Sequence, residues 1–183
     1  MNISSRTKQI TDLVEQAQTN PANFGLIYQQ YAQLIYKYIY SRVRNQQDTE
    51  DLTSQTFMNA MQSLHKYRDQ GYFSAWLFTI ARNKVRDFYR KNKPEIDVEN
   101  IDNLNRYAEG IHEQVERSLE VERLTRFVRG LKEEEQELIR LRYLAELPFA
   151  EIARVVGKKE DAVKKALYRL LERLEGQMEV ENE

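Results

Sequence analysis

Cysteine is absent from the 183 residues, and only two histidines are present. The first absence excludes disulfides and thiolate metal sites, which fits a reducing compartment. The sequence also lacks a glycine-rich phosphate loop and a pair of carboxylates in an apolar setting. His112 and Glu116 stand one helical turn apart, but a solvated linker explains that pair better than a metal site does. We therefore expect no enzyme activity, no metal and no cofactor.

Long apolar runs are also missing. No window approaches the uninterrupted apolar length that a membrane span needs. The first residues, Met1–Lys8, lack the apolar stretch of a signal peptide. We expect a cytoplasmic protein with no membrane segment of its own.

The net charge of -1 is an average over three unlike parts. Residues 1–93 carry 13 Lys and Arg against 7 Asp and Glu, residues 94–122 carry 2 against 9, and residues 123–183 carry 13 against 13. A basic first part is the electrostatic footprint of a protein that binds phosphates. Charge alone favours the alternative of a solvated basic face.

Hydrophobic spacing predicts helices throughout and no strand. Asn20-Pro21 and Asp48 are expected helix starts, and Lys93-Pro94 is an expected helix end because the residue before proline disfavours the helical region. We predict an all-α chain of two small helical domains, 1–93 and 123–183, joined by the acidic linker 94–122. Beyond Gly176 we expect a frayed tail.

A basic helix is predicted over Phe73–Arg90. Its apolar residues form one stripe, while Arg82, Arg86 and Arg90 recur every four residues on another side. Like charges at this spacing destabilise a helix by about 0.2–0.5 kcal/mol per pair. Bound phosphates would offset this repulsion by neutralising the arginines. Aromatic residues beside the cations suit stacking on unpaired bases, although Trp76 fits a core position as well.

The segment Phe149–Leu174 reads as helix, glycine turn, helix. Small Ala153 permits a close crossing, and Gly157 can adopt the left-handed turn conformation. The second helix combines an apolar stripe with a row of Lys and Arg. That pattern is typical of a DNA-binding helix-turn-helix, in which the second helix enters the major groove.

Three motifs in this order resemble bacterial RNA polymerase sigma factors of the extracytoplasmic-function type, within the sigma-70 family. Asp48–Phe57 is similar to the polymerase-binding helix D-A-E-D-L-V-Q-E-V-F, and Trp76–Arg90 to the signature W-L-x-x-I-A-R-N-x-x-x-D-x-x-R. Leu141–Lys164 is similar to the family's helix-turn-helix. The resemblance implies a region 2 helical bundle and a region 4 helix-turn-helix. In the family the acidic linker occupies polymerase channels that otherwise hold nucleic acid.

The resemblance also implies site residues. The polymerase-binding residues would be Asp48, Glu50, Asp51, Leu52, Gln55 and Phe57, of which Leu52 and Phe57 also fit core positions. Contacts with the -10 promoter element would come from Lys66, Tyr67, Arg68, Tyr72, Trp76, Arg82, Asn83, Lys84, Arg86, Asp87 and Arg90. Contacts with the -35 element would come from Lys158, Lys159, Asp161, Ala162, Lys164, Lys165, Tyr168, Arg169 and Arg173.

This chain departs from the family pattern at several positions. Ser54 and Thr56 replace residues common in the polymerase-binding helix. Ala166 and Leu171 stand where arginine is frequent, and Tyr168 takes a usual histidine position. The second helix of the helix-turn-helix is therefore expected to bind the -35 element more weakly, or to recognise an unusual -35 sequence.

Two functional hypotheses follow. The first is a transcription initiation factor that binds core RNA polymerase and promoter DNA, directs initiation and promotes melting, with an anti-sigma factor as a further partner. The alternative is a stand-alone helix-turn-helix regulator that binds duplex DNA without polymerase. The alternative leaves the Asp48–Phe57 helix and the aromatic loop without a role.

Overall fold

The computed structural model describes residues 3–68, 71–92 and 126–180 and divides into two compact units, 1–110 and 111–183. Every regular element among these residues is helical and none is a strand, which confirms the predicted all-α class. The predicted domain boundaries at 93 and 123, and the acidic linker between them, lie outside the described residues.

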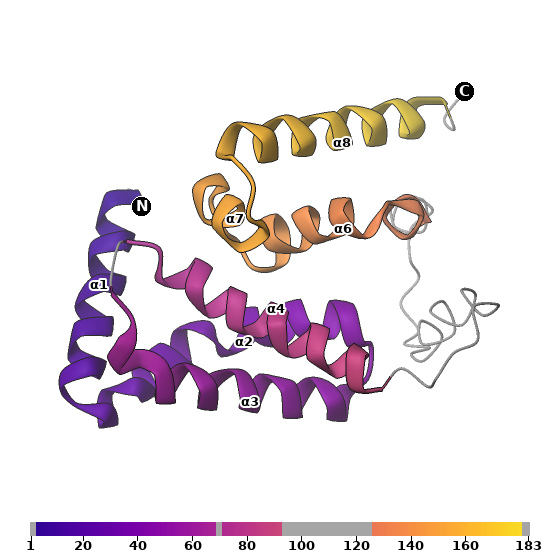
Figure 1. The fold of residues 1–183 in the computed structure, drawn as a ribbon. Helices are drawn as coiled ribbons and strands as arrows, with labels where there is room; N and C mark the ends of the chain where they lie inside the picture. The colour runs from indigo at the N-terminus through magenta and orange to yellow at the C-terminus, as the bar shows by residue number, and fades with distance from the viewer. Residues whose placement is uncertain (1–2, 69–70, 93–125, 181–183) are drawn as a thin grey trace. The chain divides into compact units, whose positions relative to one another are not determined.

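Among the described residues, the first unit contains a bundle of four α-helices with two short 3₁₀ turns. In chain order these are α1 (Ile3–Thr19), η1 (Pro21–Asn23), α2 (Phe24–Val43), α3 (Gln46–Ser63), η2 (Leu64–Lys66) and α4 (Phe73–Lys91). Helices α2, α3 and α4 pack on one another, and α1 crosses the end of this bundle beside the segment that joins α3 to α4 (Figure 1).

The core of the first unit is aromatic and aliphatic. Tyr38 and Phe78 are fully buried, with ring centroids 5.5 Å apart in an edge-to-face arrangement. Tyr31 packs on Phe73 at 5.7 Å, and its hydroxyl lies 2.9 Å from the Ser74 hydroxyl in a buried hydrogen bond. This bond joins α2 to α4 and satisfies two polar groups that would otherwise be costly to bury.

Helix starts follow local capping chemistry. The Asn20 side chain accepts a hydrogen bond from the Ala22 amide at 3.1 Å, so the predicted start at Asn20-Pro21 is confirmed, with a 3₁₀ turn preceding α2. The prediction of Asp48 as an N-cap is wrong. Helix α3 begins at Gln46, and Asn45 caps it because its side chain accepts from the Asp48 amide at 2.9 Å. Both residue types cap well, so propensity alone did not separate them.

The second unit combines several short helices with one long helix, α8. Residues 126–130 are helical, followed by α6 (Glu133–Ile139), the π-helical turn η4 (Arg140–Leu144), α7 (Phe149–Val156) and α8 (Glu160–Val180). Leu141, Ile152 and Val163 are fully buried at the centre of this unit. Residues from three different elements thus meet in one core.

Two turns shape the second unit. Glu146 has a positive φ of 55° between η4 and Pro148, which precedes α7. Gly157 has φ 68°, and its amide donates to the Ala153 carbonyl, so the predicted left-handed glycine is confirmed. Helix α8 continues through Gly176 to Val180, and the expectation of a frayed tail stays a prediction.

Candidate nucleic-acid interface

The basic stripe of α4 lies opposite the side that faces the core. Ala81 and Val85 are buried, whereas Arg86 and Arg90 are exposed and Arg82 is half-buried. Arg90 pairs with Asp87 at 3.0 Å, but the two side chains remain 71% and 43% exposed. Arg86 forms no ion pair with any residue that the structure describes. Much of the positive charge of the stripe is therefore available to a ligand.

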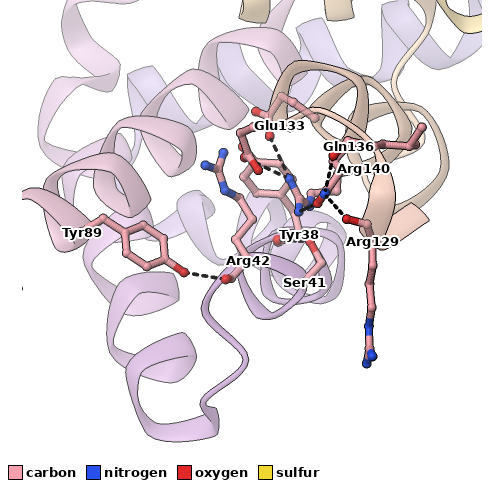
Figure 2. Close-up of polar contacts among 10 residues, drawn as sticks. Tyr38, Ser41, Arg42, Tyr89, Arg129, Glu133, Gln136 and Arg140 are labelled. Atoms are coloured by element: carbon pink, nitrogen blue, oxygen red, sulfur yellow. Dashed lines mark hydrogen bonds and ion pairs between the residues drawn. The ribbon is translucent and has the colours of Figure 1, made fainter. Parts of the chain in front are cut away.

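The polar residues inside the stripe are also accessible. Asn83 is exposed and Lys84 is half-buried. Tyr89 fixes the end of α4, because its hydroxyl donates to the Arg42 carbonyl at the end of α2 (Figure 2). The stripe is thus presented on a helix that is held at both ends, by the Ser74 contact and by Tyr89.

An aromatic cluster stands at the start of α4. The ring centroids of Tyr67 and Trp76 are 4.8 Å apart, and Phe73 lies 5.5 Å from the first and 5.4 Å from the second. Phe73 is only 2% exposed and forms the base of the cluster, while the rings of Tyr67 and Trp76 are half-buried.

Trp76 therefore touches the core through Phe73 and keeps part of its surface for a ligand. Exposed Lys66 and Arg68 flank Tyr67 in the chain, and half-buried Tyr72 precedes Phe73. Partly exposed rings beside cations are the combination that binds unpaired bases.

Helix α3 presents an acidic face. Glu50 and Asp51 are exposed and Asp48 and Gln55 are half-buried; Gln55 donates to the Asp51 carboxylate at 2.6 Å. Two predicted members of this face, Leu52 and Phe57, are each only 4% exposed and belong to the core. Both side chains pack on the core side of α3 and do not lie on its exposed face.

Exposed apolar side chains accompany this acidic face. Met58 and Met61 of α3 are 60% and 51% exposed, and Leu26 and Tyr28 of α2 are also exposed. The Tyr28 ring packs on Phe57 at 4.8 Å, which links the two helices. Met61 and Tyr28 lie at helical spacing with the apolar stripes of α3 and α2, yet both are exposed. Periodicity detects an apolar stripe but does not show how wide a part of it another helix covers.

The helix-turn-helix of the second unit exposes most of its predicted DNA contacts. Lys158 and Lys159 precede α8 and are exposed, and Lys164 on α8 is half-buried. The other predicted contacts on α8 are all exposed: Asp161, Ala162, Lys165, Tyr168, Arg169 and Arg173.

Acidic residues already hold three of these cations. Lys158 pairs with Glu134 at 2.6 Å and Arg173 with Glu135 at 3.1 Å, so the first turn of α6 contacts both the segment before α8 and a position past the middle of α8. Lys164 pairs with Glu160 at 2.7 Å. By contrast, Lys159, Lys165 and Arg169 form no ion pair with any described residue.

These pairs perturb titration in the expected directions. The hydrogen bond and charge of Lys158 hold the pKa of Glu134 below its ordinary value. The hydrogen bond from Lys164 to Glu160 raises the pKa of Lys164. In both cases the hydrogen bond and the opposite charge of the partner favour the charged form of the group whose pKa is shifted.

Phe149 anchors the surface of α8 to α7. The Arg142 guanidinium lies 4.7 Å from the centre of its ring, the Lys164 ammonium 5.8 Å and the Tyr168 ring 6.1 Å. Arg142 also donates to the Leu147 carbonyl at 3.0 Å. Two predicted DNA contacts, Lys164 and Tyr168, are thereby held against one aromatic ring.

The start of α6 is fixed by a polar network. Arg140 pairs with Glu133 at 3.1 Å and donates to the Gln136 side chain, and Gln136 donates to the Arg129 carbonyl (Figure 2). This network positions the first turn of α6, which carries the acids that bind Lys158 and Arg173.

Other kinds of site find no support in the described residues. They contain no group of three or more His, Asp or Glu side chains placed to hold a metal ion. The His112–Glu116 pair lies outside the described residues. None of the described helices combines the length and the apolar character that crossing a membrane requires.

Comparison with known proteins assigns both units. A family model of sigma-70 region 2 matches residues 27–95, and one of sigma-70 region 4 matches residues 122–174. The chain is 39% identical over 174 residues to the ECF RNA polymerase sigma factor BldN of Streptomyces coelicolor, covering 93% of this chain and 66% of that relative. It is 31% identical over 149 residues to the ECF RNA polymerase sigma factor SigM of Bacillus subtilis, covering 81% and 90%.

A solved structure shares the fold. It is the sigma factor RpoE in complex with the anti-sigma factor NepR from Bartonella quintana, with a TM-score of 0.63 and 21% identity over 86% of this chain and 98% of that one. The two region matches occur in the order in which the sequence motifs stand, and SigM is similar over most of both chains. The chain belongs to the extracytoplasmic-function family of RNA polymerase sigma factors, within the sigma-70 family.

Proposed function

We propose that the chain is a transcription initiation factor that binds core RNA polymerase, directs it to promoters with suitable -10 and -35 elements and promotes melting of the DNA. The observation that carries this proposal is the presence of a region 2 and a region 4 match on two helical units that each expose unpaired cations. We assign region 2 to residues 1–93, the linker to 94–122 and region 4 to 123–183. Such a factor catalyses no reaction itself and works where polymerase and DNA are, in the cytoplasm.

The first unit would contact both polymerase and the -10 element. The acidic face of α3, with Asp48, Glu50, Asp51 and Gln55, is proposed to bind polymerase, supported by Leu52 and Phe57 beneath it. The half-buried rings of Tyr67 and Trp76 would stack on bases of the opened strand. The α4 stripe with Arg86 and Arg90 would hold the phosphates of that strand.

The second unit would contact the -35 element. In a helix-turn-helix the start of the second helix meets base edges, and here Lys159, Asp161 and Ala162 are exposed at that point. Lys165 and Arg169 lie further along α8 without acidic partners among the described residues, so we assign them to phosphates. Lys158, Lys164 and Arg173 would have to exchange a carboxylate for a phosphate when they bind DNA.

The stand-alone regulator remains the second candidate. The helix-turn-helix of the second unit would suffice for it, and no observation on the first unit favours it. Because α3 and the aromatic cluster have a role only in the polymerase-dependent proposal, we prefer that one. An anti-sigma factor is also proposed as a partner, since the relative from Bartonella quintana was solved in complex with one.

One experiment separates the two candidates. Purified core polymerase would transcribe a library of random promoters with and without this protein, and the RNA start sites would be sequenced. We expect a new set of start sites that appears only with the protein, while the isolated protein binds the same duplexes weakly. Start sites that never depend on the protein would overturn the proposal, and tight sequence-specific duplex binding without polymerase would support the regulator.

A further inference from the structure

One side chain of helix α1, that of Gln18, forms hydrogen bonds with the segment between α3 and α4. The Gln18 amide nitrogen lies 2.9 Å from the Leu64 carbonyl and 2.8 Å from the Tyr67 carbonyl, and it donates a hydrogen bond to each. A glutamine amide nitrogen carries two hydrogens, so both of its donors are used. These bonds join residues that are 46 and 49 positions apart in the sequence.

The two carbonyls belong to Leu64 and Tyr67, in the segment that carries the Tyr67 ring of the aromatic cluster. Leu64 is buried at the end of α3, and its carbonyl also accepts from the Tyr67 amide at 3.0 Å, which closes the η2 turn. Gln18 thus fixes the backbone of Tyr67 directly. The Tyr67 ring contacts Phe73 and Trp76, so the orientation of the ring pair depends on where this backbone lies.

Helix α1 is itself well anchored. Val14 and Ala17 on its inner side are buried at 0% and 3% exposure, whereas Gln18 lies at the edge of the same face. The region 2 match begins only at residue 27, after α1 has ended. The bonds from Gln18 therefore come from a part of the chain that the region 2 match does not include.

We propose that Gln18 is a positioning residue for the -10 element: it holds Tyr67 in the orientation in which Tyr67 and Trp76 stack on an unpaired base. This inference rests on the proposed function. A segment that is already ordered loses less conformational entropy when a ligand binds. Without the two bonds from Gln18, Tyr67 keeps its ring contacts and its amide bond to Leu64, but a bound base must supply more of its ordering. We expect affinity for the opened strand to fall about three- to tenfold.

The test uses the complete chain assembled with core polymerase. Gln18→Met removes the donors but keeps side-chain length and a similar helix propensity. Gln16→Met is the matched control, because Gln16 lies on the same helix, is equally exposed and makes no side-chain hydrogen bond with a described residue. Binding would be measured to a fork-junction promoter whose -10 bases are unpaired, and to a duplex that carries only the -35 element.

A fluorescent base analogue in the -10 strand reports stacking on the aromatic rings. For Gln18→Met we expect weaker binding to the fork and less quenching of the analogue, with -35 binding and polymerase assembly unchanged. The double variant Gln18→Met with Tyr67→Ala should bind the fork no more weakly than Tyr67→Ala alone, because the glutamine acts through that ring.

Two results would overturn the inference. One is equal fork binding by the Gln18→Met and Gln16→Met proteins, and the other is a further loss when Gln18→Met is added to Tyr67→Ala. Failure of the proposed function looks different: the unmodified protein would then fail to bind or open any fork. Thermal unfolding of each variant checks that a loss on the fork is not a general loss of folding, which would lower -35 binding and assembly as well.

Discussion

Replacing Arg86 by alanine tests the phosphate-binding stripe at its most informative position. Arg86 is exposed, stands four residues from both Arg82 and Arg90, and has no acidic partner among the described residues. Its neighbour Arg90 pairs with Asp87 at 3.0 Å. If the stripe binds the opened strand, Arg86 can give its full positive charge to a phosphate, because no carboxylate of the described residues pairs with it.

The expected magnitude follows from counterion release. Each phosphate contact changes the slope of log affinity against log salt by about 0.7 on single strands and about 0.9 on duplex. Between 50 and 200 mM salt, a fourfold range, one lost contact therefore alters the affinity ratio of variant to wild type by about threefold. The defect of Arg86→Ala should be largest at low salt and shrink by that factor at high salt.

The same substitution should not harm folding. It removes two like-charge pairs on the helix, each worth about 0.2–0.5 kcal/mol of repulsion, and introduces a better helix former. We therefore expect an unfolding midpoint equal to or above that of the wild type. A loss of promoter affinity combined with unchanged or higher stability points to a contact with DNA and away from misfolding.

Fork-junction binding by the holoenzyme, measured at several salt concentrations, provides the assay. Arg90→Ala is the internal comparison: because Asp87 already neutralises part of the Arg90 charge, its effect on the slope should be smaller. If the Arg86→Ala holoenzyme shows the same salt slope as the wild type, Arg86 does not contact phosphate and the assignment of the stripe fails.

Three further predictions concern stability. Tyr31→Phe leaves the buried Ser74 hydroxyl without the bond at 2.9 Å and should cost about 1–3 kcal/mol in denaturant unfolding, with partial recovery when Ser74→Ala is added. Gly157→Ala should lower stability by about 1–2 kcal/mol through its φ of 68° alone, because an added Cβ would meet open space; Gly157→Asn should cost less in the same thermal assay. Glu134→Gln removes a carboxylate whose pKa Lys158 depresses, so its stability difference from wild type should be present above pH 4.5 and disappear as pH falls through the lowered pKa in an acid titration of unfolding.

Local chemistry explains the parts of the fold that sequence predicted. The left-handed Gly157, the start at Asn20-Pro21 and the apolar side of α4 each follow from a residue type and its immediate neighbours. Within the predicted interface, the exposed cations of α4 and α8 stand opposite the apolar stripes that the spacing identified. In a helix, burying one face determines which residues remain outside.

Long-range contacts explain what sequence did not predict. The bonds from Gln18 and the pair of Lys158 with Glu134 join residues between 24 and 49 positions apart, and no local pattern encodes such partners. The π-helical turn Arg140–Leu144 likewise went unpredicted, since its residues have ordinary helix propensities. The exposure of Met61 likewise depends on which side of α3 a neighbouring helix covers.

Intramolecular pairing on the second unit helps to account for the expected dependence on polymerase. Glu134 pairs with Lys158 and Glu135 with Arg173, so if these two cations bind phosphates as proposed, DNA must displace two carboxylates of the first turn of α6. Exposed ion pairs of this kind are individually weak, so they would lower affinity for DNA without preventing binding. Attachment to polymerase raises the effective concentration of the promoter near α8, which compensates for weak binding by the isolated unit. On this proposal the two ion pairs lower the affinity of the isolated unit, and attachment to polymerase supplies the compensation.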